Sequence, residues 1–302
     1  MLGLATSAPY GWTVSKTRVI QTRLGPVEVM YRPGDKPAAL FFPGGHCSAA
    51  SDCGWSLYTS EGHGVLAFSR PGYGNTDVGP LNAAEFVPAV AACCQELGID
   101  QTAAAVGVSF GGMQALHAAL SLPELVPRLV LHSCAPSTLA YPDTRLESLF
   151  GPLAFSPALQ GLTWAMVACF IRSDAGLRRM VGALSKTPVN TWWHTWSMED
   201  KRRARELFST MRSGSGFVND LHQARPDRAA YRRLVQTRTS RPTLVTGSRQ
   251  DAGVAFAHAE DYADTIPGAV LVELSAPSHL FWLGPAGEEA QAAVSAFMAS
   301  HA

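Results

Sequence analysis

Residues 103–112 read Ala-Ala-Ala-Val-Gly-Val-Ser-Phe-Gly-Gly and decide how the rest of the chain is interpreted. The small and apolar residues 103–108 are typical of a strand buried on both faces of a parallel sheet. An Ala- and Leu-rich helical segment follows at once, so a Gly-x-Ser-x-Gly pattern lies on a strand-to-helix turn. Such a turn holds its serine in a strained conformation that projects the hydroxyl above the sheet, and it needs tiny residues two before and two after. Gly107 and Gly111 meet that need, which indicates that Ser109 is a nucleophile.

The same alternation of short apolar runs and helical segments extends in both directions from this turn. Two N-terminal β-rich runs joined through Leu24-Gly25-Pro26 predict a hairpin, and the later runs are bounded by Gly, Pro or Asp. Repeated strand–helix–strand units predict a doubly wound α/β fold with a mostly parallel, eight-stranded sheet and helices on both faces. The predicted strands are 14–20, 27–31, 38–42, 64–68, 103–108, 128–132, 243–246 and 270–274, and the predicted helices are 83–97, 110–121, 255–265 and 287–299.

The pattern stops near Pro136 and resumes at Pro242. Residues 137–241 have helical stretches and no convincing strand, so we predict that they form an inserted helical cap on a core made of residues 1–136 and 242–302. This interval holds sixteen Lys or Arg against eight Asp or Glu, whereas the whole chain has a formal net charge of zero. The cap is therefore basic and the core is acidic to the same extent. Opposite charges could dock the cap or guide an anionic substrate beneath it, and the sequence leaves both open.

Composition excludes several classes of protein. With 47% hydrophobic and 16% charged residues, the chain is neither disordered nor a coiled coil. A net charge of zero gives no overall attraction to nucleic acid or anionic membrane, and no stretch approaches the roughly 20 apolar residues that span a bilayer. The first residues lack the basic and apolar regions of a secretory signal, so we expect a cytoplasmic protein.

No phosphate-binding loop, dinucleotide fingerprint or metal-spaced set of His and Cys is present, so we expect no cofactor and no metal. The six cysteines include no Cys-x-x-Cys, and we expect reduced thiols, although pairing of Cys47 with Cys53 stays open.

A serine hydroxyl needs a base, and in sheets of this kind the base follows an acid late in the chain. His279 comes shortly after the last predicted strand, at the carboxyl end where sites in such sheets form. The acid should follow the preceding strand, and Asp251 is the only carboxylate between Asp227 and Glu260. We therefore predict Ser109, His279 and Asp251 as nucleophile, base and acid.

With these motifs the chain resembles the α/β-hydrolase superfamily, in the subgroup with a helical cap inserted after the sixth strand. Leu40-Phe41-Phe42-Pro43-Gly44-Gly45-His46 resembles the family's His-Gly oxyanion loop, and Ser69-Arg70-Pro71-Gly72-Tyr73-Gly74-Asn75-Thr76 resembles its Arg-Pro-Gly-Tyr-Gly-x-Ser segment. Five motifs occur in family order across residues 13–299, the cap excepted.

The resemblance implies an oxyanion hole formed by the backbone amides of Gly45 and Phe110. It also agrees with the triad roles of Ser109, His279 and Asp251. Two departures are visible: Pro43 replaces the family's usual histidine, so other hydrogen bonds must hold the loop, and the Asp251 loop has one residue more than usual between its glycine and its aspartate.

The serine excludes epoxide hydrolase and dehalogenase chemistry, for which the family uses an aspartate nucleophile. We expect a serine hydrolase, similar to carboxylesterases, that cleaves a small, largely apolar acyl substrate through an acyl-enzyme. Three alternatives stay open: a thioesterase or acyltransferase acting on CoA- or carrier-linked acyl groups, a carbon–carbon bond hydrolase, and a non-catalytic small-molecule receptor. Neither substrate identity nor oligomeric state can be inferred.

Four tryptophans of the cap are candidates for an apolar acyl pocket, with packing between cap helices as an equal alternative. They are Trp164, Trp192, Trp193 and Trp196. The basic run Lys201-Arg202-Arg203-Ala204-Arg205 lies in a helical segment, and a solvated face is favoured there over an anion site.

Overall fold

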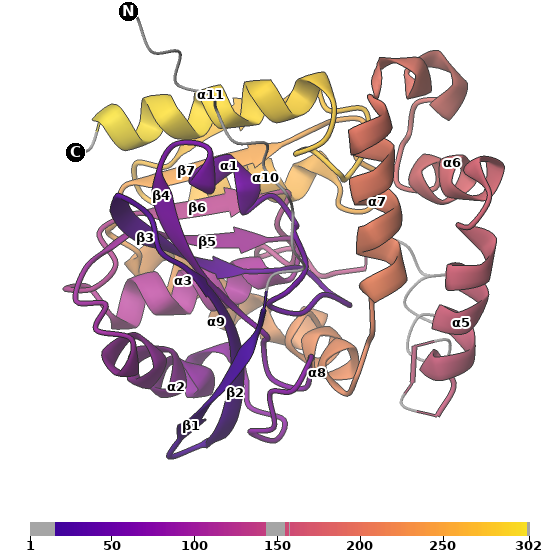
Figure 1. The fold of residues 1–302 in the computed structure, drawn as a ribbon. Coiled ribbons are helices and arrows are strands. Elements are labelled where there is room, and N and C mark those ends of the chain that lie inside the picture. Colours follow the sequence, from indigo (N-terminus) through magenta and orange to yellow (C-terminus); the bar gives the residue numbers. More distant parts are fainter. Residues whose placement is uncertain (1–15, 143–154, 157, 301–302) are drawn as a thin grey trace, which may run out of the picture.

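The computed structural model describes residues 16–142, 155–156 and 158–300, and its centre is one eight-stranded sheet (Figure 1). The strand order is β1-β2-β4-β3-β5-β6-β7-β8; β2 pairs antiparallel with β1 and β4, and every other pairing is parallel. The strands are β1 (Arg18–Thr22), β2 (Gly25–Arg32), β3 (Lys36–Phe42), β4 (His63–Phe68), β5 (Thr102–Val108), β6 (Leu129–His132), β7 (Thr243–Gly247) and β8 (Val270–Glu273).

Helices cover both faces of the sheet, as the alternating pattern predicts. On one face α1 (Ser56–Thr59) packs against α11 (Pro285–Ser300). The other face carries α2 (Ala83–Glu96), α3 (Gly111–Ser121), α9 (Ala229–Arg238) and α10 (Phe256–Thr265). In Figure 1 α11 runs above the strands and α2 and α3 lie below them.

Alternate residues of the central strands supply two hydrophobic cores. In β3, Phe41 faces the core shared with α11, whereas Leu40 and Phe42 face the core shared with α2 and α3. All three side chains are fully buried, because a central parallel strand has helices on both sides. This is why its sequence is a continuous apolar run rather than an alternating one.

The sequence-based fold prediction is confirmed: the sheet is eight-stranded and mostly parallel, and each predicted element that lies within the described residues is found within a few residues of its expected bounds. The short helix α1 is not predicted, since its four residues are too few to show a helical period. Residues 14 and 15 of the predicted hairpin lie outside the described residues. Within the described ranges, each helix is too short or too polar to span a bilayer.

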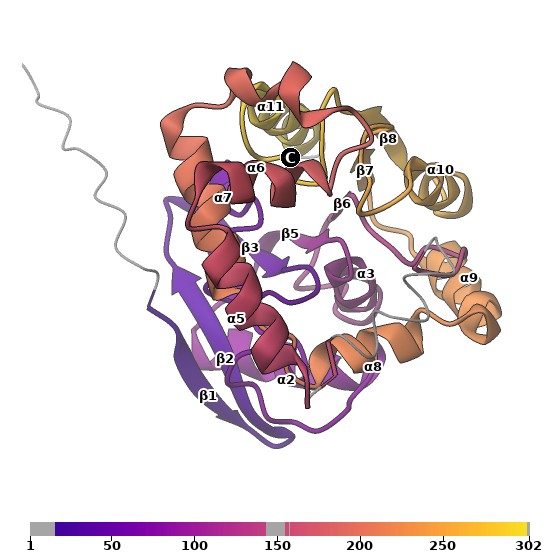
Figure 2. The ribbon, with the colours of Figure 1, turned by 90° about the vertical axis from the view of Figure 1, so that its right-hand side faces the viewer.

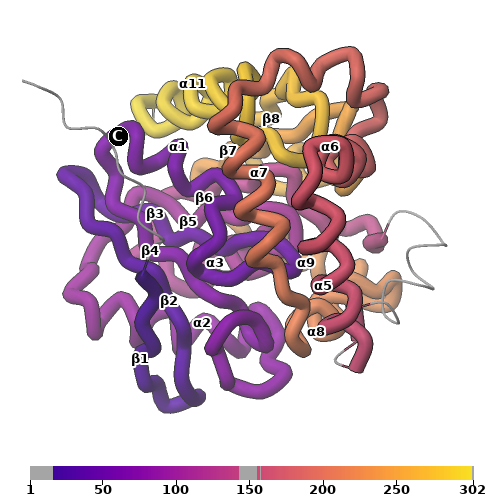
Figure 3. Tube along the Cα trace, turned by 45° about the vertical axis from the view of Figure 1, so that its right-hand side comes forward, coloured from indigo at the N-terminus to yellow at the C-terminus, as the bar shows by residue number. Residues whose placement is uncertain are grey.

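Most of the described helices of the inserted interval stand together at one side of the sheet, over the ends of the parallel strands (Figures 2 and 3). The exception is α9, which packs against α3 and α10 in the helical layer of the core. The division at residues 137 and 241 stays a prediction. The other helices are α5 (Gln160–Phe170), α6 (Asp174–Gly182), η1 (Val189–Thr191), η2 (Trp193–Thr195), α7 (Met198–Thr210), α8 (Gly216–Gln223) and η3 (Pro226–Arg228).

A buried ion pair joins the inserted interval to the core. Arg70, in the loop after β4, makes a bidentate contact with Asp220 of α8 at 2.5 and 2.8 Å. The Tyr73 hydroxyl donates to the same carboxylate at 2.6 Å. Both charged side chains are almost fully shielded from solvent, so each depends on the other for the hydrogen bonds that water would otherwise supply.

We expect Asp220→Ala to lower the free energy of unfolding by about 3–5 kcal/mol, because it leaves the Arg70 guanidinium buried without its counter-ion. The matched control is Glu206→Ala, which breaks an ion pair with Arg202 on the exposed face of α7 and should cost less than about 1 kcal/mol. Urea unfolding of the two variants measures both. Equal losses would contradict the assignment of the buried pair as a structural joint.

Candidate active site

The turn between β5 and α3 has the geometry that the Gly-x-Ser-x-Gly pattern predicts. Ser109 has a φ of +52°, a left-handed conformation that L residues seldom adopt. A Cβ on Gly111 would lie 1.9 Å from the carbonyl oxygen of Phe42, and one on Gly107 would lie 2.6 Å from the Cα of Gly112. Both positions therefore exclude any side chain, and the strained turn can exist only with glycine there.

The loop after β3 lies directly against this turn. A Cβ placed on Gly44 would be 3.0 Å from the Cβ of Ser109 and 3.7 Å from its Oγ, and one on Gly45 would be 3.1 Å from the Phe110 ring. Across the described residues, no hydrogen bond within the protein occupies the backbone amide of Gly45 or of Phe110. The two predicted oxyanion donors thus lie on adjoining segments next to the serine.

Hydrogen bonds from the loop after β4 hold the Pro43 loop in place. Arg70 Nε donates to the carbonyl oxygen of Pro43 at 2.9 Å, and the amide of Ala49 donates to Ser69 Oγ at 2.8 Å. These are the other hydrogen bonds that the loop needs, because Pro43 stands where the family usually has a histidine. The Arg70–Asp220 pair therefore fixes the loop as well as joining two parts of the fold.

Asp251 and His279 meet at the carboxyl edge of the sheet, on the loops after β7 and β8. His279 Nδ1 lies 2.7 Å from Asp251 Oδ2. The other carboxylate oxygen accepts from the amides of Gly253 at 2.7 Å and Val254 at 3.0 Å, and Asp251 is only 1% exposed. Gly253 also backs the imidazole, since a Cβ there would lie 3.0 Å from His279 Cγ. The additional residue in the loop leaves Asp251 within reach of His279.

The charge environment of His279 is set by two opposed effects. Burial lowers the pKa of the imidazole, but the negative charge of Asp251 and its hydrogen bond raise it by more. The net effect is a pKa above the ordinary value of 6.5. Because Asp251 engages Nδ1, Nε2 is the nitrogen left to exchange a proton with a serine.

A short segment after α6, residues 184–186, forms hydrogen bonds with the loops that carry Asp251 and His279. The carbonyl oxygen of Leu184 accepts from the amides of His279 at 3.0 Å and Ala252 at 3.1 Å. The amide of Lys186 donates to the carbonyl oxygen of Gln250 at 2.8 Å. Asp251 and His279 are thus held by the same short segment, 184–186, a link that the sequence does not reveal because it depends on irregular backbone.

His46 is a residue of the site to which the sequence analysis assigned no role of its own. It has a φ of +65°, and its ring lies 4.2 Å from the Phe217 ring and 5.1 Å from the Trp164 ring, measured between centroids. Its Nδ1 and the Trp164 Nε1 both reach the hydroxyl of Ser213, each at 2.9 Å. Burial and the nearby Arg70 charge lower its pKa to about 3, so the ring is neutral. The one sequence feature that could have pointed to His46 is its position directly after Gly44-Gly45.

The structure separates the four tryptophans for which an acyl pocket and packing between helices are equal alternatives. Trp164 lies beside His46 of the oxyanion loop. The rings of Trp192, Trp193 and Trp196 instead pack on one another, with centroids 5.5–6.4 Å apart. Trp196 also faces Gly284, where a Cβ would lie 2.5 Å from its ring. These contacts favour the packing alternative for the three and leave Trp164 as the pocket candidate.

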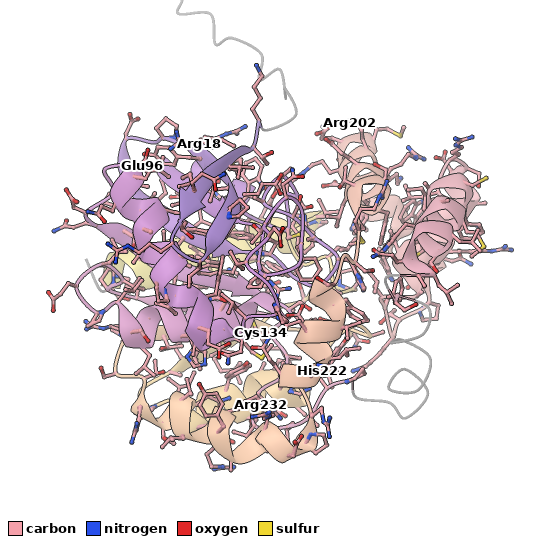
Figure 4. All side chains as sticks on the ribbon, turned by 90° about the horizontal axis from the view of Figure 1, so that it is seen from below. Arg18, Glu96, Cys134, Arg202, His222 and Arg232 are labelled. Carbon is pink, nitrogen blue, oxygen red and sulfur yellow. The ribbon has the colours of Figure 1, made fainter. Side chains whose placement is uncertain are left out.

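The basic run on α7 divides into two kinds of contact. Arg202 faces solvent and pairs with Glu199 and Glu206 of its own helix, as a solvated face predicts (Figure 4). Arg203 instead contacts Asp52 at 2.8 Å and Ser56 at 2.6 Å, and so docks α7 on the core. The two cysteines whose pairing the sequence leaves open, Cys47 and Cys53, are buried free thiols.

We expect His279 to titrate above pH 6.5 and Asp251→Asn to move its pKa below that value. The substitution removes the charge that raises the pKa and leaves the burial that lowers it. NMR titration of the imidazole Cε1 proton measures both values. Asp261→Asn is the matched control, because Asp261 is a partly buried carboxylate that bonds Thr138 instead of the imidazole; an equal shift in that variant would contradict the assignment.

Comparison with known proteins bears on the fold and the family of the chain. The chain is 28% identical over 268 residues to a Bacillus subtilis (strain 168) protein described as the uncharacterized hydrolase YcgS, covering 86% of this chain and 91% of that one. Among solved structures, an alpha/beta hydrolase fold protein from Nakamurella multipartita matches with a TM-score of 0.72 at 21% identity, over 94% of this chain and 99% of the other. The enol-lactonase from Burkholderia xenovorans LB400 matches with a TM-score of 0.64 at 17% identity, over 93% and 100% of the two chains. A family model for the alpha/beta hydrolase fold covers residues 40–285. The chain therefore belongs to the alpha/beta hydrolase fold family.

Proposed function

We propose that this protein is a serine hydrolase that cleaves small, largely apolar carboxylic esters. The observation that carries the proposal is what four loops place at the carboxyl edge of the sheet: a strained Ser109, the Gly44-Gly45 backbone against it, and an Asp251–His279 pair with 2.7 Å between Oδ2 and Nδ1. A structural turn needs none of these together, whereas acyl transfer needs all of them. The hydrolase description of the Bacillus subtilis relative supports the broader activity.

In the proposed reaction Ser109 Oγ attacks the ester carbonyl carbon while its proton passes to His279 Nε2. The imidazolium then gives that proton to the departing alcohol as the carbon–oxygen bond breaks, which leaves an acyl-enzyme. Water attacks the acyl carbon, its proton passes to His279, and the acid leaves as the proton returns to Ser109. Asp251 accepts a hydrogen bond from Nδ1–H throughout and stabilises the charged ring.

The oxyanion of each tetrahedral intermediate would accept hydrogen bonds from the amides of Gly45 and Phe110. Donors of this kind contribute about 2.7–4 kcal/mol each to transition-state stabilisation, because they are oriented before the charge develops. Their positions depend on the glycines that let the two backbones approach and on the Arg70 bond to Pro43.

The preference for an apolar substrate rests on the aromatic side chains beside the oxyanion loop. The rings of Phe155, Trp164 and Phe217 all lie within 5.1 Å of the His46 ring, measured between centroids. His46 is neutral because burial and the Arg70 charge depress its pKa, so it adds no charge to this wall. An acyl group held there would be selected by contact area.

The basic composition of the cap gives little support to acyl-CoA as the substrate. Arg202, Arg203 and Arg205 are each paired with a carboxylate. Arg232 donates to backbone carbonyl groups. These four of the sixteen basic residues of the interval are engaged within the protein, which disfavours them as the site of a CoA tail and favours a neutral ester.

We expect Ser109→Ala to lower kcat for p-nitrophenyl butyrate by about 10⁴-fold or more and to abolish labelling by a fluorophosphonate. Ser133→Ala is the matched control, because Ser133 also follows a strand and has a positive φ of +44°, yet lies after β6. It should keep kcat within a few fold. Esterase activity that survives in Ser109→Ala would refute the mechanism, and stoichiometric binding without turnover in the wild-type protein would indicate a receptor.

The pH profile of kcat/KM should show an acid limb with its midpoint above pH 6.5. The base must be neutral, and a raised pKa keeps His279 protonated up to a higher pH than an ordinary histidine. Activity should therefore be lost as pH falls through that midpoint and level off above it. A profile that is flat from pH 5 to 8 would exclude His279 as the base.

A further inference from the structure

The helix α5 lies at the outside of the inserted interval and exposes an apolar face. It packs against α7 and stands on the side of α7 that is turned away from the sheet (Figures 1 and 2). Leu162, Met166 and Phe170 are 43–64% exposed, and Leu159, which precedes the helix, is 42% exposed. Steps of three and four residues separate these positions, so they form one line along the helix, which we call the α5 stripe.

An exposed stripe of this kind differs from the rest of the surface. Single apolar side chains are common at protein surfaces, but a contiguous group of them marks a contact with an apolar partner. The sequence has no charged residue between Glu147 and Arg172, so the helix itself contains nothing that opposes such a contact. Its inner face is buried through Trp164, which donates to the Ser213 hydroxyl. The helix is therefore held to the protein by its inner face while its outer face meets solvent.

Three arginines adjoin the stripe. Arg172 directly follows α5, Arg178 and Arg179 lie on the neighbouring α6, and all three are exposed. Among the described residues no carboxylate forms an ion pair with them, and the exposed Asp174 pairs with Arg205 instead. The whole chain has no net charge, but this surface is locally positive. It is therefore complementary to an anionic lipid bilayer, where phosphate groups lie next to acyl chains.

A second copy of the chain fits this surface less well. With 11 residues α5 is about 16 Å long, and a stripe roughly 10 Å wide offers on the order of 200 Å². A stable protein interface takes about 800 Å² from each partner. Two copies joined here would also bring their arginines together, which is unfavourable between like charges. A bilayer has neither problem, because a few inserted side chains and phosphate contacts give reversible binding.

We propose that the α5 stripe and the three adjoining arginines dock the protein on an anionic lipid bilayer. In the docked state α5 lies parallel to the membrane plane, with its outer face at the boundary between headgroups and acyl chains. Its inner face carries Trp164 beside the ring of His46, so docking brings the aromatic wall of the candidate site toward the phase in which apolar esters dissolve. The proposal concerns binding, and it does not depend on the proposed reaction.

Cys169 allows a direct test. It is the exposed cysteine of the chain, since the other five are buried, and it lies seven residues after Leu162, on the same face of α5. An environment-sensitive fluorophore on Cys169 should brighten when phosphatidylcholine vesicles with about 30% phosphatidylglycerol are added, and nitroxide-labelled lipid should quench it. Vesicles of phosphatidylcholine alone should bind at least about tenfold more weakly, and added salt should weaken binding to the anionic vesicles.

Two double variants separate the apolar and the electrostatic contributions. Leu162→Gln with Met166→Gln should weaken vesicle binding at least about tenfold, because the exposed side chains lose their apolar contact while the inner face of α5 is unchanged. Arg178→Gln with Arg179→Gln should weaken binding to the anionic vesicles about tenfold and reduce its dependence on salt. Vesicle sedimentation of the unlabelled proteins measures both effects.

The matched control is Arg23→Gln with Leu24→Gln, which removes exposed residues of the same two kinds from the β1–β2 hairpin and should keep wild-type binding. Ser109→Ala should also bind as wild type does, so loss of the proposed reaction and loss of docking are observed separately. Protein that stays out of the vesicle pellet, or binding that neither double variant on α5 and α6 weakens, would overturn the proposal. A dimer that forms without lipid and is lost in Leu162→Gln with Met166→Gln would assign the surface to a second copy instead.

Discussion

The close approach of two backbones at the carboxyl edge of the sheet is the constraint on which the rest of the site depends. The loop after β3 and the turn after β5 come so near that the Cβ of any residue at position 111 would strike the Phe42 carbonyl oxygen, and Gly44 lies against Ser109 itself. Because the two strands are hydrogen-bonded neighbours, their ends are brought together by the sheet. Glycine then removes the steric barrier that would keep them apart.

Residues of the inserted interval contact the loops at this edge of the sheet in two places. Asp220 of α8 holds Arg70, which holds the Pro43 carbonyl and with it the loop that carries Gly44 and Gly45. On the other side, the Leu184 carbonyl holds the loops of Asp251 and His279. Residues 137–241 therefore help to set the relative positions of these loops, so substitutions there can alter the candidate site without changing Ser109, Asp251 or His279.

The ion pairs between residues 137–241 and the rest of the chain do not all follow the net charges of these two parts. The Arg203–Asp52 pair joins the basic interval 137–241 to the acidic remainder of the chain, as the composition suggests. In the most buried ion pair the charges are reversed: the positive Arg70 lies outside the inserted interval and the negative Asp220 lies within it. Net charge describes the surface as a whole, whereas docking depends on a few desolvated contacts whose sign can run against it.

The sheet, the strand-to-helix turn at Ser109 and the order of Ser109, Asp251 and His279 could be predicted from the linear chain, because periodicity and glycine spacing are local patterns. The partners that hold these residues became visible only in the folded chain: Arg70 bonds Pro43, Leu184 bonds His279, and His46 and Trp164 both bond Ser213. It also separated Trp164 from the other three tryptophans of the cap, which share its residue type but not its surroundings. These contacts join residues that are far apart in the chain and lie in irregular loops. Such loops have no repeating sequence pattern, so the sequence does not indicate which residues will meet.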